Sequence, residues 1–339
     1  MQRKRTTLRE LAESIGVHSS TVSRVMNPET RHLISDAVVE QVLSAAHQLN
    51  FFPNQSAATL RTSRSHIIGV VLPDIANPIF PPILRGIEDE LARNGYIPLI
   101  ANAEGGKERQ RFVIDQMVGR QVDGLILATS ERHDPLLEHC LAVGIPVVVV
   151  NRSEDSNRAS CVVGDNLLAM LQAVAHLVKS GHTCVAHVAG PDDLSTGHER
   201  RLGFLEAVRV NGLKKTRCPV VEAKALHRDE GRAACDRLLE NHRGITAIVA
   251  ANDLLALGCY DSICAHGLRC PQDISVVGHN DMPLMDSVAP PMTTVRIPLY
   301  EMGVRAAILM LEKLDGTTTA HVNVVLRPEL VVRQSTIAR

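Results

Sequence analysis

Aromatic residues are scarce in this chain of 339 residues: Trp is absent, and only three Tyr and five Phe occur. Flat ligands are often recognised by stacking on aromatic rings, and few rings are available here. Phe80 is the main candidate for such a platform, and His227 is the second. We therefore expect any small molecule to be recognised mainly through hydrogen bonds and charge.

Long apolar runs and paired cysteines are also missing. No apolar run approaches the ~18 residues of a membrane-spanning helix, and the charged start MQRKRTTLRE is not followed by the apolar segment of a secretory signal. Eight cysteines occur, none of them in a CxxC pair, and most lie inside apolar stretches. This is typical of reduced core thiols. We predict a cytoplasmic protein that has no membrane partner.

The motifs of common catalytic and cofactor sites are absent. The sequence contains no GxSxG, HExxH, P-loop or GxGxxG pattern, so we expect neither an enzyme nor a bound cofactor. His182 and His187 lie in or beside a predicted strand without an evident metal partner, so we interpret them as core or surface histidines. The sequence predicts no metal site.

Charge is balanced overall but not along the chain, whose formal net charge is −1. Residues 1–65 contain eight Lys or Arg against five Asp or Glu, and the remainder contains 28 against 32. A basic N-terminal segment on a mildly acidic body suits a DNA-binding domain carried by a sensor. The alternative is that this difference in charge between the two parts of the chain arose by chance, and the charge counts alone leave it open.

Residues 6–27, TTLRELAESIGVHSSTVSRVMN, predict two short helices joined by a tight turn. Thr7 and Glu10 have the spacing of a capping box, and Gly16 permits a sharp turn. The first helix has an apolar stripe at i, i+3, i+4 and i+7, formed by Leu8, Leu11, Ala12 and Ile15. Such a pair of helices is a helix-turn-helix, which places its second helix in the DNA major groove.

In the second helix, Val22 and Val25 are expected to face inward, while Ser19, Ser20 and Arg24 face outward. The sequence LRELAESIGVHSSTVSRVMN closely resembles the N-terminus of the lactose/galactose-repressor (LacI/GalR) family of bacterial transcription regulators. We expect the two serines to read bases and Arg24 to contact a base or a phosphate.

His18 departs from the family pattern, in which a Ser or Thr cap commonly stands at this position. Ser19 or Ser20 would then cap the second helix instead, or His18 itself would contact phosphate. Both alternatives stay open at this point.

A third helix is expected to start at Ser35, and Pro53 prevents its continuation. The segment NFFPNQSAATLRTSRSHIIGVVLP resembles the family's hinge, in which paired helices enter the minor groove and a leucine wedges between base pairs. Leu60 is the matching residue; the alternative is that it covers an apolar patch of the linker itself. The candidate DNA-contacting residues are Thr7, His18, Ser19, Ser20, Thr21, Ser23, Arg24, Asn27, Asn54, Ala57 and Leu60.

From residue 67 onward, short apolar runs alternate with amphipathic stretches. The expected strands lie within residues 67–73, 97–103, 123–129, 145–151, 161–165, 183–190, 245–253 and 274–281. The expected helices lie within residues 79–94, 107–120, 135–143, 166–180, 198–211, 229–241 and 254–266. Because the runs lack polar alternation, they fit strands buried on both faces of parallel sheets with right-handed crossovers.

This region is too long for one sheet and predicts two lobes, with residues 293–298 and the C-terminal ELVVRQST crossing back between them. The layout resembles the ligand-binding core of the same family, which is like a periplasmic sugar-binding protein. The predicted fold class is therefore α/β: an N-terminal helical helix-turn-helix DNA-binding domain and a two-lobed periplasmic-binding-protein-like core of parallel sheets. The predicted domains are 1–50 for the head, 51–65 for the hinge and 66–339 for the effector-binding and dimerisation core.

Ligands of parallel sheets bind beyond the carboxyl ends of the strands, so the residues that follow each strand are candidates. Several could instead cap the next helix, because Asp165-Asn166 and Asn252-Asp253 each precede one, and capping explains them at least as well. The candidate effector-binding residues are Asp74, Asn77, Phe80, Ser130, Asn151, Ser195, Arg200, His227, Asn252 and Asn280.

The resemblance assigns roles to three of these residues. Arg200 in STGHERRLGF matches the effector-anchoring arginine, Asn252 in VAANDLLALG matches a ligand-contacting asparagine, and Asn280 in GHNDMP stands where the family often has a ligand-binding aspartate. An amide at this last position, with Arg132 and Arg152 nearby, favours an acidic ligand such as a sugar acid over a neutral sugar.

The resemblance implies a sequence-specific DNA-binding regulator, with a repressor as the favoured mode, whose operator affinity is switched by a sugar or sugar acid bound between the lobes. Ligand would change lobe closure and so the folding of the hinge helices. An activator or corepressor mode stays open. A solute-binding receptor is the rival from another class, and it is disfavoured because it predicts a signal peptide and no DNA-binding head.

A homodimer, with a tetramer left open, would place two heads on a near-palindromic double-stranded operator. The predicted helix 254–266, LLALGCYDSICAH, is apolar on more than one side. We therefore expect it at the dimer interface.

Overall fold

The computed structural model describes residues 6–51, 64–318 and 320–339. The chain divides into two compact units, Met1–Ser65 and His66–Arg339. Most of the predicted hinge lies outside the described residues. None of the helices in the described parts of the chain is long and apolar enough to cross a membrane.

The first unit is a small helical head. Its helices are α1 (Leu8–Ser14), α2 (Ser19–Met26), α3 (Pro28–Arg31) and α4 (Asp36–Gln48). The core is built around Leu11, Val22 and Val25, which are completely buried, and the ring of Phe51 adds to it. The single turn α3 precedes the third helix that was expected to start at Ser35.

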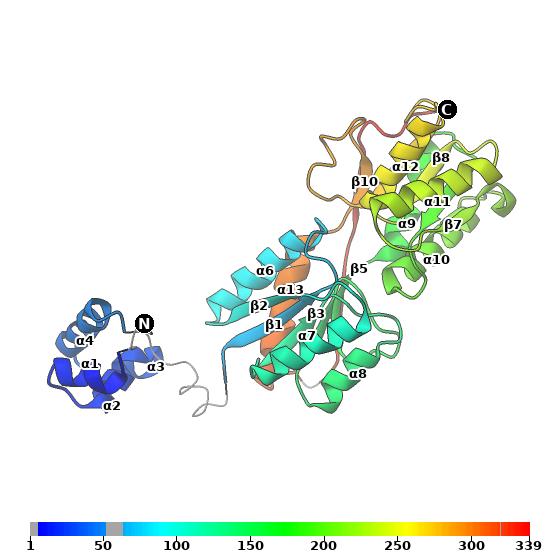
Figure 1. Cartoon of the computed structure of the whole chain (residues 1–339). Coiled ribbons are helices and arrows are strands. Elements are labelled where there is room, and N and C mark those ends of the chain that lie inside the picture. Colours follow the sequence, from blue (N-terminus) through cyan, green and yellow to red (C-terminus); the bar gives the residue numbers. More distant parts are fainter. Residues whose placement is uncertain (1–5, 52–63, 319) are drawn as a thin grey trace. The chain divides into compact units, whose positions relative to one another are not determined.

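The second unit consists of two lobes, each built on a six-stranded sheet (Figure 1). The first sheet has the order β11-β5-β4-β3-β1-β2, and all of its strands run parallel. Its strands are β1 (Ile67–Leu72), β2 (Ile97–Asn102), β3 (Gly124–Leu127), β4 (Val147–Val150), β5 (Ser160–Gly164) and β11 (Asn323–Leu326).

The second sheet has the order β12-β10-β9-β8-β6-β7. Only β12 runs antiparallel, at one edge against β10. The strands are β6 (Val185–Ala189), β7 (Val220–Glu222), β8 (Ala247–Ala250), β9 (Ser275–Asn280), β10 (Thr293–Arg296) and β12 (Glu329–Val331).

Helices cover both faces of each sheet, as the buried runs require. In the first lobe these are α6 (Phe80–Arg93), α7 (Lys107–Gly119), α8 (Pro135–Ala142) and α13 (Leu299–Leu314). In the second they are α9 (Asn166–Lys179), α10 (Ser195–Val210), α11 (Arg228–Asn241) and α12 (Asp253–Ala265), with the 3-10 turn η1 (Lys215–Arg217). Helices α6 and α13 pack as a pair, as do α9 with α10 and α11 with α12.

The chain crosses between the lobes three times. It passes from β5 to α9, from β10 to α13, and from β11 to β12 (Figure 1). The second crossing is the predicted one at residues 293–298, and the third immediately precedes the predicted C-terminal one. These links allow the two sheets to move relative to each other while the strand ends stay opposed.

Several elements were not predicted from the sequence, among them α13, β7 and β11. The helix α13 was not predicted, although Met302, Ala306, Ala307 and Met310 have helical spacing and are buried. The strands β7 and β11 were also missed, since both are short edge strands whose side chains are partly exposed. Helix α10 begins at Ser195, three residues before the expected start, and this places its first turn beside the cleft.

Candidate functional site

The head has the local features of a helix-turn-helix. The Thr7 hydroxyl accepts a hydrogen bond from the N–H of Glu10, and the Glu10 carboxylate accepts one from the N–H of Thr7, which confirms the predicted capping box. Gly16 has a φ of +70°, a left-handed value that favours glycine. The chain therefore leaves α1 sharply and enters α2 one turn later.

The structure decides the capping part of the question raised by His18, because His18 is itself the N-cap of α2, while its contact with phosphate stays a prediction. Its Nδ1 accepts a hydrogen bond from the N–H of Ser20 over 3.2 Å and lies 2.8 Å from the Ser20 hydroxyl. The expectation that Ser19 or Ser20 would cap instead is wrong. The imidazole takes this role because its ring nitrogen reaches the same N–H as a serine hydroxyl would.

Five of the eleven predicted DNA-contacting residues lie in α2, and they differ in exposure. Ser20 and Arg24 are exposed, as are His18 and Thr7, whereas Ser19, Thr21, Ser23 and Asn27 are partly buried. Val22 and Val25 face the core, as predicted. Asn54, Ala57 and Leu60 lie outside the described residues, so their predicted roles stay predictions.

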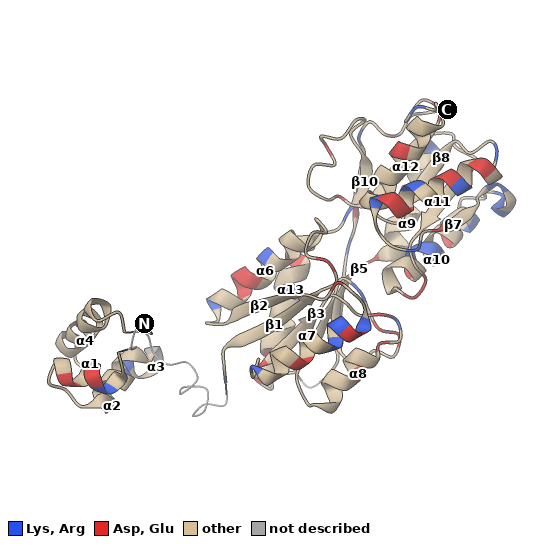
Figure 2. Cartoon of the chain, viewed as in Figure 1, with Lys and Arg blue, Asp and Glu red and all other residues tan. Residues whose placement is uncertain are grey.

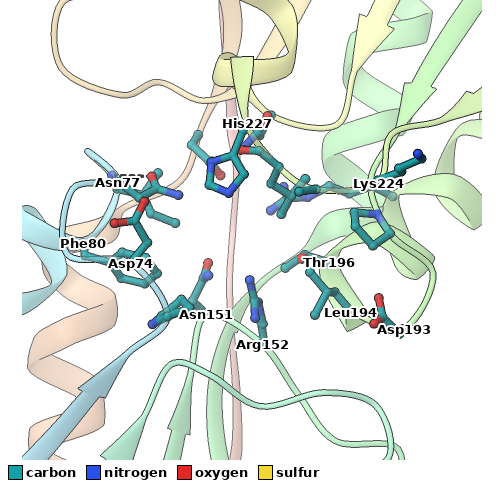
Figure 3. A pocket seen from close by; sticks show the side chains of 18 of the residues that line it. Asp74, Asn77, Phe80, Asn151, Arg152, Asp193, Leu194, Thr196, Lys224 and His227 are labelled. Carbon is teal, nitrogen blue, oxygen red and sulfur yellow. Dashed lines mark hydrogen bonds between the residues drawn. The ribbon is translucent and has the colours of Figure 1, made fainter. Parts of the chain in front are cut away.

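The second candidate site is a cavity between the two lobes of the core, with a volume of about 240 Å³ (Figure 3). It lies at the carboxyl ends of the strands of both sheets, where parallel sheets bind ligands. Eight of the ten predicted effector-binding residues line it: Asp74, Asn77, Phe80, Asn151, Arg200, His227, Asn252 and Asn280. Figure 3 shows Asp74 and Phe80 on one side and Thr196 and Lys224 on the other.

Ser130 and Ser195 were predicted in the cavity but are not among its lining residues. Ser130 is fully buried. The hydroxyl of Ser195 accepts a hydrogen bond from the N–H of Ser153 over 2.9 Å, a contact that joins the first lobe to α10. A place shortly after a strand was therefore not sufficient to put the side chains of Ser130 and Ser195 in the cavity.

Asn252 shows that capping and cavity lining are compatible. Its Oδ1 accepts a hydrogen bond from the N–H of Leu255, which caps α12, and its Nδ2 donates to the carbonyl of Leu226. The same amide lines the cavity. Asn252 therefore both caps α12 and lines the cavity.

Two arginines, Arg152 and Arg200, line the cavity, whereas Arg132, which was also expected near the ligand, does not. Arg200 is 4% exposed and donates to Asn166 Oδ1 over 2.8 Å and to the carbonyl of Ala251 over 2.7 Å. Burial lowers the pKa of both Arg200 and Arg152 to about 10. Arg132 is instead held outside the cavity by ion pairs with Asp155 and Asp192, so its expected place near the ligand is wrong.

Three charged residues that line the cavity were not among the residues predicted from the sequence: Glu104, Asp193 and Lys224. Glu104 and Lys224 follow the edge strands β2 and β7, and the second of these was not predicted at all. In Figure 2 the Lys, Arg, Asp and Glu positions coloured along the ribbon lie mainly on helices and loops. Charges in the cavity are therefore a local feature of the strand ends.

Comparisons with known proteins agree with this geometry. Residues 7–54 match the family described as "Bacterial regulatory proteins, lacI family", and residues 174–336 match a "Periplasmic binding protein-like domain". The chain is 33% identical to the HTH-type transcriptional regulator CelR of Thermobifida fusca, over 98% of this chain and 99% of that protein. The chain belongs to the lacI family of bacterial regulatory proteins.

Other lacI-family members are similarly close. The chain is 30% identical to the HTH-type transcriptional repressor CytR of Escherichia coli (strain K12), over 99% of this chain and 98% of that protein. It superimposes on the lac repressor dimer bound to operator and the anti-inducer ONPF with a TM-score of 0.87 and 26% identity, covering 99% of this chain and all of that chain. The CelR–cellobiose complex gives a TM-score of 0.75 at 31% identity, covering 98% of this chain and all of that chain.

Membership of the lacI family establishes the general activity. The chain is a DNA-binding transcriptional regulator rather than an enzyme. Its helix-turn-helix head binds DNA, and a small ligand of the periplasmic-binding-protein-like core switches that binding. The predicted family, fold class and regulatory function are confirmed.

Proposed function

We propose that this chain is a cytoplasmic repressor that acts as a homodimer and releases its operator when a sugar or sugar acid binds in the cavity between the lobes. The observation that carries the proposal is the cavity itself, in which side chains of both lobes meet. A ligand that contacts both lobes stabilises one degree of closure over others, and this differential affinity is what an allosteric switch requires.

The proposed effector contacts are Asp74, Asn77, Phe80, Asn151, Arg200, His227, Asn252 and Asn280. Together they offer amide, carboxylate and guanidinium groups in several directions, which suits a polyhydroxylated ligand. Two relatives point to the same class: CelR is described in complex with cellobiose, and another regulator from Enterococcus faecium with ribose. Among the rings of the cavity, Phe80 supplies the apolar face.

The proposed DNA contacts are the outward residues of α2, chiefly Ser20 and Arg24, with Ser19, Thr21, Ser23, Asn27, Thr7 and His18 around them. Asn54, Ala57 and Leu60 are proposed to act in the minor groove by the family resemblance. A two-fold dimer would present two such heads to two half-sites of one operator. The lac repressor, to which the core is similar, is described as a dimer on its operator.

The proposed dimer interface includes α12. Much of its apolar surface is buried within its own lobe, against α11 and the sheet, so its apolarity does not by itself require a partner. Leu254, Leu257 and Tyr260 remain partly buried only. Sedimentation of the core at micromolar concentration tests this interface, and a monomeric core would contradict it.

An operator selected from random duplex DNA, followed by gel shifts with and without ligand, tests the proposed function. We expect binding that weakens steeply with salt, since phosphate contacts release counterions. R24A should weaken binding by at least about tenfold, whereas R93A, a matched Arg→Ala change on the exposed face of α6, should leave it within about twofold. Ligand that strengthens operator binding would instead indicate a corepressor.

A further inference from the structure

The side chain of Arg152 is half-buried in the cavity wall. Its Nε is shielded from solvent and has no hydrogen-bond acceptor among the described residues, and the guanidinium forms no ion pair with them. Asp193 lies close enough to favour the charged form, yet burial outweighs it and lowers the pKa of Arg152. An unpaired buried cation is costly unless something else compensates its charge.

Arg200 adds a second guanidinium, whose charge the nearby Glu199 and Asp253 carboxylates offset only in part, because burial lowers its pKa. Its two observed acceptors are a neutral amide and a backbone carbonyl, and it forms no ion pair within the described parts of the chain. It lies near enough to Arg152 for the two charges to repel, which contributes to its lowered pKa. The cavity wall thus holds two guanidinium groups at one end.

The N-terminus of α10 opens on the same end. Its N-cap residue Leu194 offers no side-chain acceptor, and its first turn contains no acidic residue, so the positive end of this 16-residue helix is not neutralised by a cap. Thr196, in that first turn, is 2% exposed and lines the cavity, and its hydroxyl has no partner among the described residues.

Arg152 and the N-terminus of α10 are neighbours, although they come from different lobes. The hydrogen bond from the N–H of Ser153 to the hydroxyl of Ser195 joins the residue after Arg152 to the residue before Thr196. Figure 3 shows Arg152 and Thr196 on the same side of the cavity, away from Asp74 and Phe80. We define this end, formed by Arg152, Thr196 and Arg200, as the cationic corner.

We propose that the cationic corner binds the anionic group, a carboxylate or a phosphate, of a polyhydroxylated effector whose hydroxyls face Asp74 and Asn77. An anion satisfies the Arg152 and Thr196 donors together and compensates both guanidinium charges, whereas a neutral hydroxyl compensates neither. The Asp74 and Glu104 carboxylates of the first lobe disfavour the opposite orientation. The inference rests on the proposed function, in which this cavity is the effector site.

The anion also links ligand binding to lobe closure. Arg152 follows β4 of the first lobe, and Thr196 lies in the first turn of α10 of the second. An anion held by both favours the closed arrangement, so a ligand without it should both bind and switch less well. The ligand class therefore decides how strongly the operator responds.

The test compares acids with their neutral parents on the full chain. The probes are gluconate and galactonate for the carboxylate, glucose 6-phosphate and ribose 5-phosphate for the phosphate, and glucose, galactose, ribose and sorbitol as neutral parents. Binding is measured by calorimetry and thermal shift at constant ionic strength, because screening would otherwise differ between probes. We expect at least one acid to bind at least about tenfold more tightly than its parent.

The variants R152M and T196V each remove one hydrogen-bond-donating side chain of the cationic corner, and R201M is the matched control. Arg201 is the next residue along α10 from Arg200 but pairs with Asp192 and Glu222 outside the cavity. We expect R152M to weaken acid binding by at least about tenfold and T196V by about threefold or more, with R201M within about twofold. Neutral parents should be affected less than the acids.

The stability of the free protein distinguishes a binding role from a structural one. Because R152M removes a half-buried charge that has no ion pair among the described residues, it should leave the melting temperature of the ligand-free chain unchanged or raise it while affinity falls. A lowered melting temperature with equal loss for acids and neutral sugars would mean that Arg152 only supports the fold. T196V, which is nearly isosteric, repeats the test without a change in charge.

The outcomes separate this inference from the proposed function. Operator release by a neutral sugar, with its acid no better, would overturn the anion site but leave the proposed function intact. Binding of no acid in the panel would also overturn the inference. Failure to bind any selected operator would instead contradict the proposed function, whatever the ligand data show.

Discussion

At the residue scale, the side chain of Asp253 shows how burial sets charge next to the cavity. It is fully buried at the start of α12, where it accepts hydrogen bonds from the N–H of Met282 and the hydroxyl of Thr294. Burial raises the pKa of Asp253 to about 7, helped by the nearby Asp281 charge and opposed by the two hydrogen bonds. Asp281 is itself paired with Arg296 and Arg333.

The pKa of Asp253 predicts a pH dependence of stability. Since the folded chain holds this proton more tightly than the unfolded chain, the free energy of unfolding should fall as pH rises from the ordinary carboxyl pKa of about 4 to about 7. In D253N this contribution is absent. Melting temperatures recorded from pH 5 to 7.5 should therefore decline more steeply in the parent chain than in the variant, and parallel curves would contradict the raised pKa.

The cap formed by His18 gives a second prediction at this scale. H18S keeps a side-chain acceptor for the N–H of Ser20, so the head should keep its stability and operator binding should stay within about threefold. H18A loses the cap and should cost about 1 kcal/mol. Urea unfolding of the head and operator gel shifts measure both. A large loss of binding in H18S with unchanged stability would show that the imidazole contacts DNA directly.

At the scale of elements, close helix packing depends on glycines that the sequence pattern does not single out. A Cβ on Gly86 in α6 would lie 2.1 Å from the carbonyl oxygen of Tyr300 in α13, and one on Gly303 would lie 2.0 Å from that of Ile83. The two backbones approach each other reciprocally at these points. Neither contact can relax by moving a side chain, because the neighbouring atoms are backbone.

The prediction for this helix pair uses matched Gly→Ala changes. G86A should destabilise the core by at least about 1–3 kcal/mol, since α6 and α13 must separate to accommodate the methyl group. G119A, at the end of α7 where a Cβ meets nothing within 4 Å, should be neutral or stabilise by up to about 1 kcal/mol. Urea midpoints compare the two, and equal effects would mean that the close approach is not present in solution.

Most elements followed from periodicity, and those that failed have physical reasons. Buried parallel strands such as β1 and β4 are continuous apolar runs, so they were recognised. The strands β7 and β11 are each an edge strand of their sheet, so their side chains are partly exposed. Their sequences therefore lack the continuous apolar run that marks a buried strand. Helix α13 lies between β10 and β11, neither of which was predicted as a strand, so no recognised strands marked its position in the alternation.

At the scale of the whole molecule, the head and the core are separate units with separate hydrophobic clusters. The large apolar cluster of the core includes residues of both lobes. Ligand binding should therefore depend on the core alone, whereas the response of the operator needs both units.

Residues 66–339 alone should bind the effector with the affinity of the full chain, within about twofold, since every lining residue of the cavity lies there. Calorimetry on both proteins with the same ligand checks this. The isolated head, with its small core, should unfold at a lower temperature than the core. Loss of ligand binding on removal of the head would contradict the independence of the units.

Features that depend on neighbours along the chain could be predicted from the amino-acid sequence: the capping box at Thr7, the turn at Gly16 and the identity of the buried strands. Local hydrogen bonds and hydrophobic periodicity suffice for these. The tertiary structure decided which strand-end residues reach the cavity, because that depends on partners far along the chain. Asp155 and Asp192 hold Arg132 outside, while Arg152 has no such partner and remains in the wall.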